Sequence, residues 1–136
     1  IKVTVYDGKY HSVDSKEVAF VSAARKAVQA AVREAKPVIL EPIVQVEVLA
    51  PEAHVGDVSG DLASHRGQVT GTRAALPGQL RIQGLAPLAE LASFQTRLNA
   101  LTSGQASYTL SLSHYEPVPP NLQAQLVAGF TRQEEE

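Results

Sequence analysis

The sequence predicts an α+β protein with an incomplete strand–helix unit over residues 1–40 and a βαββαβ sandwich over residues 41–116. Residues 117–136 are expected to form a Pro-rich linker, a short helix and an acidic tail. Two observations predict this class. Several short segments alternate apolar and polar residues, as strands with one buried face do. Longer segments between them carry an apolar residue every three or four positions, as amphipathic helices do.

The first unit begins with residues 1–6, which alternate with period 2 and predict a half-buried strand. Asp7-Gly8 ends this strand with a turn. Asp14, with Glu17 three residues later, predicts a capping box at the start of a helix. The helix is expected to run as far as Pro37, which pushes the residue before it out of the α region. Its apolar stripe contains Phe20, Ala24, Ala27, Val28 and Ala31.

One strand and one helix cannot bury each other's apolar faces, so residues 1–40 are expected to be the end of a larger domain. Their exposed apolar surface would favour a non-native dimer of the isolated chain. The chain also lacks methionine, and we therefore expect it to be a piece of a longer protein.

The second unit contains six predicted elements. They are a strand over 44–48 that Pro51 ends, a helix over 55–67, strands over 68–75 and 79–85 joined by the turn Leu76-Pro77-Gly78, a helix over 88–101 that Ser103-Gly104 ends, and a strand over 107–113. This order predicts a ferredoxin-like sandwich, in which an antiparallel sheet carries both helices on one face. After it, residues 121–130 predict a short amphipathic helix.

Composition and charge exclude several classes of protein. The 136 residues carry a net charge of −2, which by itself argues against nucleic-acid binding, although residues 1–36 hold seven bases and four acids. We expect no DNA partner. No apolar segment approaches the roughly 18 residues that a membrane-spanning helix needs. The absence of cysteine rules out disulfides and thiolate metal sites and fits a cytoplasmic protein.

The residues that could carry chemistry favour neither a metal site nor catalysis. His11, His54, His65 and His114 lack the spacing of metal ligands. A ferredoxin-like acylphosphatase would need a cationic loop after its first strand, whereas Glu52 supplies an acid there. We therefore expect no catalytic, cofactor-binding or metal-binding residue in this chain.

The segment Gly56–Asp61 resembles a phosphate loop only superficially, because it lacks the lysine and hydroxyl of that motif and lies within a predicted helix. Gly56 and Gly60, four residues apart, are instead expected to permit close packing of the helix backbone. Asp57 and Asp61 would then be solvated or pair with Arg66.

A contact surface is the remaining candidate. Lys9, Tyr10 and His11 lie together in a predicted turn, where a cation, an aromatic ring and an imidazole could contact phosphates and stack on bases. The alternative is an ordinary polar hairpin tip. Arg66, at the end of the predicted helix, is a weaker case of the same kind.

Residues 3–15, VTVYDGKYHSVDS, resemble the VTLYDGSYHxVDSSE segment of elongation factor G, the ribosomal translocase. The resemblance continues through PVILEPI at 37–43, GDVSGDL at 56–62, HRGQ at 65–68, PLAEL at 87–91, SYT at 107–109 and HY at 114–115. It covers nearly the whole chain in the family's order.

This resemblance implies the end of the family's fourth domain, a left-handed βαβ fold, followed by its ferredoxin-like fifth domain. It implies a ribosome partner: His11 matches the tip that reaches the decoding region, and the fifth domain docks near the GTPase-associated centre. The GTPase domain, with GTP and Mg²⁺, would lie upstream. His65 and Arg66 occupy the place of two family arginines and are further candidates for RNA contact.

The chain departs from the family where His65, Asn99 and Gln105 replace cations, which predicts weaker docking at the large subunit and a divergent paralogue. The alternative is a regulatory or protein-interaction module that no longer acts on the ribosome.

Overall fold

The computed structural model describes residues 1–130, and the predicted acidic end at 133–136 lies outside them. The chain divides into two compact units, Ile1–Pro37 and Val38–Glu136. No helix among the described residues is both long and apolar enough to cross a membrane.

The first unit contains one long helix, α1 (Glu17–Glu34). The strand predicted over residues 1–6 is wrong, because this segment has no regular secondary structure. A strand needs a neighbour for its N–H and C=O groups, and no described segment pairs with it. Its apolar side chains remain exposed, Val5 at 89% and Tyr6 at 94%.

Helix α1 begins later than the capping box predicts. Its N-cap is Lys16, and no side chain caps the first turn. Asp14 instead accepts the Lys16 N–H through its backbone carbonyl at 3.1 Å. The helix ends before Pro37 as expected, with Lys36 in the left-handed region at φ 53°.

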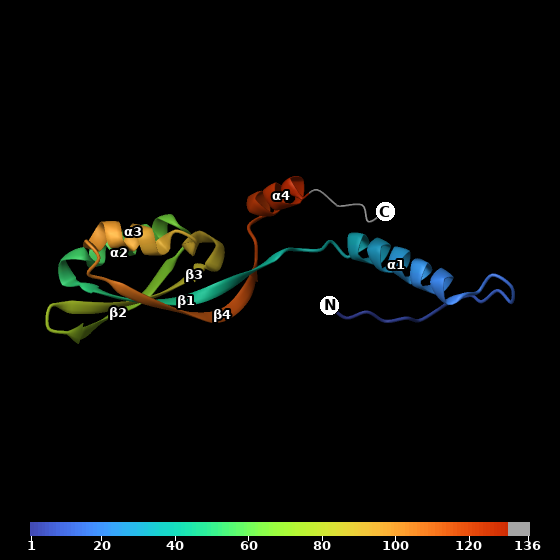
Figure 1. Ribbon diagram of the computed structural model, residues 1–136, viewed down its shortest axis with the longest axis horizontal. Coiled ribbons are helices and arrows are strands. Elements are labelled where there is room, and N and C mark those ends of the chain that lie inside the picture. The colour runs from blue at the N-terminus through green and yellow to red at the C-terminus, as the bar shows by residue number, and fades with distance from the viewer. Residues whose placement is uncertain (131–136) are drawn as a thin grey trace. The chain divides into compact units, whose positions relative to one another are not determined.

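The second unit is built on a four-stranded antiparallel sheet in the order β2-β3-β1-β4. Its strands are β1 (Leu40–Pro51), β2 (Gln68–Leu76), β3 (Gln79–Pro87) and β4 (Ser107–Pro117). Helices α2 (Val55–Ser64) and α3 (Phe94–Thr102) cover one face of this sheet (Figure 1). The predicted ferredoxin-like fold is confirmed.

Two short 3₁₀ helices modify the predicted helices. The helix η1 (Glu52–His54) precedes α2, and η2 (Leu88–Leu91) replaces the first turn of the helix predicted over 88–101. The apolar residues here recur every third position, which fits a 3₁₀ turn as well as an α-helical one. Ser103, with φ 51°, and Gly104, with φ 75°, end α3 as expected.

The core lies between the helices and the inner face of the sheet. Phe94 of α3 is fully buried and meets Tyr108 of β4 edge to face, with ring centroids 4.9 Å apart. The other buried members are Val44, Val46, Val48, Ala50, Val58, Leu62, Ile82, Ala86, Leu91, Leu98 and Ala106.

The chain leaves the sheet into α4 (Pro120–Gly129), close to the helix predicted over 121–130. The Pro-rich segment before α4 is packed, since Pro117 belongs to β4 and Val118 is buried. The Val118 N–H donates to the Ile39 carbonyl at 2.8 Å. This segment therefore forms part of the second unit.

Candidate functional site

The loop before α1, residues 7–15, is held by its own hydrogen bonds. The His11 N–H donates to Ser15 Oγ, and the Ser15 N–H donates back to the His11 carbonyl at 3.1 Å. Asp7 Oδ1 accepts the Gly8 N–H at 2.7 Å. The loop thus has a defined local shape although all but one of its residues are exposed.

One nitrogen of the His11 ring is hydrogen-bonded within the loop. Nδ1 accepts the backbone N–H groups of Val13 at 3.3 Å and Asp14 at 3.2 Å. In this arrangement the neutral ring carries its proton on Nε2, which has no partner among residues 1–130. The side chain is 66% exposed, so the Nε2–H group is available as a donor to a binding partner.

The Tyr10 ring packs against a residue of α1. Its ring stacks on Phe20, with centroids 6.4 Å apart and planes 12° apart, yet 74% of its surface remains exposed. Lys9 beside it is also exposed. The structure therefore brings Lys9, Tyr10 and His11 together on one short loop.

His65 and Arg66 lie in the second unit, between α2 and β2. His65 Nδ1 lies 2.8 Å from the Asp61 carbonyl, to which a protonated Nδ1 would donate. Arg66 adopts a left-handed conformation with φ 57°. The connection is thus a tight turn held by both residues.

The Arg66 guanidinium is already occupied by two carboxylates. Two nitrogens donate to Glu41 at 2.8 and 3.0 Å, and Nε donates to Glu90 at 3.1 Å. These bonds, chiefly those to Glu41, raise the pKa of Arg66, although burial opposes them. Arg66 consequently offers less to an RNA phosphate than its sequence position suggests.

The aspartates of α2 do not pair with Arg66, contrary to one of the two expectations. Asp61 accepts Nε of Arg97 at 3.0 and 3.1 Å, while Asp57 is exposed and lies 4.0 Å from His54. Arg66 follows the end of α2 in a left-handed conformation, and its guanidinium binds Glu41 and Glu90 instead.

The predicted packing role of Gly56 and Gly60 is wrong. A Cβ placed on either glycine would have no atom outside the neighbouring backbone within 4 Å, and both residues are exposed on α2. The demanding glycine is Gly67, where a Cβ would lie 2.6 Å from the Leu62 carbonyl oxygen. Sequence spacing does not reveal this contact, because it depends on the path of the chain beyond the helix.

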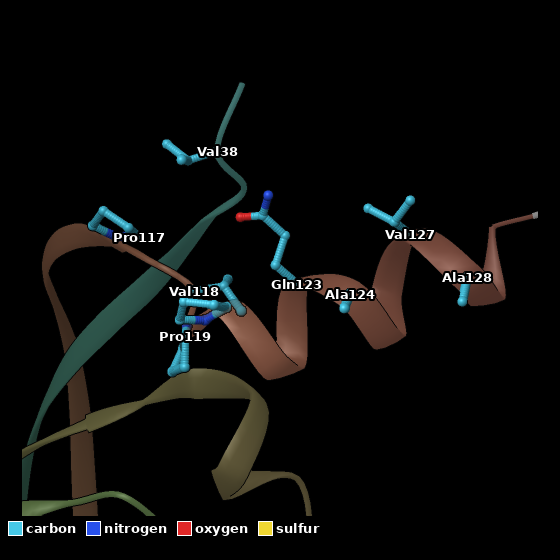
Figure 2. Close-up of a pocket in the computed structure, with 9 residues that line it drawn as sticks. Val38, Pro117, Val118, Pro119, Gln123, Ala124, Val127 and Ala128 are labelled. Carbon is cyan, nitrogen blue, oxygen red and sulfur yellow. The ribbon is translucent and has the colours of Figure 1, made fainter. Parts of the chain in front are cut away.

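The sequence also gives no sign of an apolar groove along α4. Figure 2 shows Ala124, Val127 and Ala128 of α4 beside the chain near Val38 and Pro117. Among the lining residues, Gln123 supplies an amide, whose Oε1 accepts the Ile39 N–H at 3.2 Å. The groove thus lacks the several convergent polar groups that usually orient a small molecule.

No group of three or more His, Asp or Glu side chains in residues 1–130 is arranged to hold a metal ion. His114 Nε2 contacts Glu116 at 2.6 Å, a pair on the edge strand β4.

Comparison with known proteins gives consistent matches over both units. Residues 38–126 match the model described as elongation factor G C-terminus, and residues 1–36 match that of elongation factor G, domain IV. An elongation factor G-like protein of Thermotoga maritima is 40% identical over 136 residues, which are 100% of this chain and 20% of the relative. A crystal structure of a Thermus thermophilus protein is 43% identical with a TM-score of 0.76, over 90% of this chain and 18% of that protein. The chain thus spans about a fifth of the length of its curated relative.

Proposed function

This chain belongs to the elongation factor G family, and we propose on that premise that it is a ribosome-contacting part of a translation GTPase. A role related to translation elongation follows from the family. In our proposal, residues 1–40 end a domain IV-like unit and residues 41–116 form domain V. GTP and Mg²⁺ would bind an upstream domain of a cytoplasmic parent protein, and this part would contribute contact and shape.

The loop over residues 7–15 is the observation on which the proposal depends. It presents an ammonium group, a braced aromatic ring and an imidazole donor on one exposed, internally hydrogen-bonded turn. Cations position a protein on RNA phosphates, and aromatic rings stack on unpaired bases. We propose that Lys9, Tyr10 and His11 contact ribosomal RNA in the decoding region.

The second unit would dock near the GTPase-associated centre. His65 remains a candidate RNA contact. Arg66 would instead stabilise the turn after α2 through its bonds to Glu41 and Glu90. The cations that the family has in place of His65, Asn99 and Gln105 would each have added about one released counterion to binding. We therefore expect docking with weaker salt dependence, as in a divergent paralogue.

The test uses the full-length parent protein with Lys9→Ala and His11→Ala together. We expect ribosome-dependent activity to fall at least about tenfold, because the variant loses both a phosphate contact and an imidazole donor. Lys26→Ala is the matched control, since it removes an exposed cation from α1 outside the loop. Translocation rate and co-sedimentation with ribosomes are the measurements.

The alternative function is a regulatory or protein-interaction module. It would be favoured if the double variant and Lys26→Ala behaved alike in both measurements. The apolar groove along α4 is the observation that favours this alternative, because an apolar lining suits a protein segment better than RNA.

A further inference from the structure

On the sheet face away from the helices, one arginine has no carboxylate partner among residues 1–130. Among the four arginines of residues 38–130, Arg66 pairs with Glu41 and Glu90, Arg97 with Asp61, and Arg81 with Glu47. Arg73 has no carboxylate within ion-pair distance in this part of the chain, and it is exposed. Its charge is therefore available to a partner outside the unit.

The sheet register places Arg73 directly opposite Arg81 on the neighbouring strand. Like charges at opposed positions of an antiparallel pair repel each other and disfavour the sheet. Glu47, the acidic neighbour on this face, already binds Arg81 at 3.2 Å and Gln83 at 3.1 Å. The fold thus leaves one positive charge of this pair uncompensated.

The sheet register places the two arginines on the face away from the helices, where Leu49 of β1 lies opposite Arg81 and the next row contains Gln83, Glu47 and Thr109. The buried residues Val46, Val48 and Ile82 point toward the helices, so the residues between them in β1 and β3 face the other way. Register pairs this outer row with the hydroxyl residues Thr109 and Ser111 of β4. Side-chain amides and hydroxyls are common ligands of phosphate and ribose oxygens.

We propose that this outer face binds an RNA phosphodiester chain, with Arg73 as the principal phosphate ligand and Arg81 as its neighbour. Charge complementarity selects the occupant, because the unpaired charge of Arg73 favours a polyanion over a neutral protein surface. The inference rests on the proposed function only in taking the RNA to be ribosomal.

The decisive variant is Arg73→Glu in the complete chain. The new carboxylate would face Arg81, so the fold should keep or raise its melting temperature while RNA binding falls. Arg25→Glu is the matched control, because it reverses an exposed charge on α1 in the other unit. A loss of RNA binding with retained stability cannot come from unfolding.

The probe is a short labelled polyuridine, followed by fluorescence anisotropy between about 50 and 200 mM salt. We expect Arg73→Glu to weaken binding at least about tenfold at the lower salt and to reduce the salt slope by about one or more. Arg25→Glu should change affinity no more than about threefold. Equal losses in both variants, or no binding by the unmodified chain, would overturn the inference.

Purified large ribosomal subunits form the second arm. Subunit binding that falls with Arg73→Glu supports both proposals, and unchanged subunit binding overturns the use of this face on the ribosome. Failure of the unmodified chain to bind subunits, combined with Arg73-dependent polyuridine binding, counts against the proposed function and in favour of an RNA-binding sheet face.

Discussion

Arg66 shows how one side chain can join three elements of the second unit. It follows α2, its two carboxylate partners lie in β1 and η2, and the Glu41 side chain is only 12% exposed. Such a fork of charge-assisted bonds is stronger than an isolated surface pair, and its loss leaves a poorly solvated carboxylate behind. The residue is therefore more valuable to the fold than to RNA contact.

Removing this side chain should destabilise the protein. We expect Arg66→Ala to lower the free energy of unfolding by about 1–3 kcal/mol, because Glu41 loses its bidentate partner in a largely buried position. Arg66→Lys should recover only part of this loss, since an ammonium group cannot form the fork. Chemical denaturation at neutral pH measures both.

Arg73→Ala is the control at the same scale, as it removes an arginine that has no carboxylate partner in the described part of the chain. Its free energy of unfolding should stay the same or rise slightly. If Arg73→Ala lowered the free energy of unfolding as much as Arg66→Ala does, the ion pairs of Arg66 would not be the cause of the loss in the Arg66 variant.

The sequence predicts contact residues only where they are close together in the chain. Lys9, Tyr10 and His11 are adjacent in the chain, so their joint exposure on a turn follows from local pattern. The partners of Arg66 are 24 and 25 residues away in sequence, and pairing at that range depends on the sheet register. Composition and spacing contain no such information.

At the scale of elements, helix α2 and the turn after it contain glycines of opposite character. Gly60 is exposed within the helix and has open space where a Cβ would lie. A glycine in an exposed helix interior costs about 0.5–1 kcal/mol relative to alanine. Gly67, beyond the helix end, passes too close to the Leu62 carbonyl to accept a Cβ.

We therefore expect opposite results from two identical substitutions. Gly60→Ala should raise the free energy of unfolding by about 0.5–1 kcal/mol. Gly67→Ala should lower it by about 1–3 kcal/mol, because the new Cβ would lie 2.6 Å from a backbone oxygen and the turn would have to shift. Thermal or urea denaturation of the two variants distinguishes them, and a shared direction would contradict this account.

The elements themselves were largely predictable because their patterns are local. Alternation at Val44, Val46 and Val48 predicts β1, and the order of elements predicts the sheet. The strand predicted over residues 1–6 is wrong because strand formation is not local. The segment alternates apolar and polar residues as a strand does, but the described chain offers it no strand with which to pair. A strand is a property of a pair of segments, whereas a helix such as α1 satisfies its own backbone.

At the scale of the whole molecule, the two units differ in how completely they bury their apolar residues. The second unit has a core of buried apolar residues, whereas α1 in the first unit contains no buried residue. Phe20 is 48% exposed and Val28 is 41% exposed on its apolar stripe. The chain spans about a fifth of the length of its curated relative.

Exposed apolar surface of this kind promotes association, so we expect the isolated chain to form a dimer. We expect its mass from light scattering after size exclusion to rise toward twice 14.5 kDa as concentration increases. Phe20→Glu combined with Val28→Glu should keep it monomeric, since two charges on the stripe oppose its burial. Ser22→Glu, at an exposed polar position of the same helix, should leave the dimer intact. A chain that stays monomeric at high concentration would show that this surface does not drive association, and dimers that persist in the double variant would place the contact elsewhere.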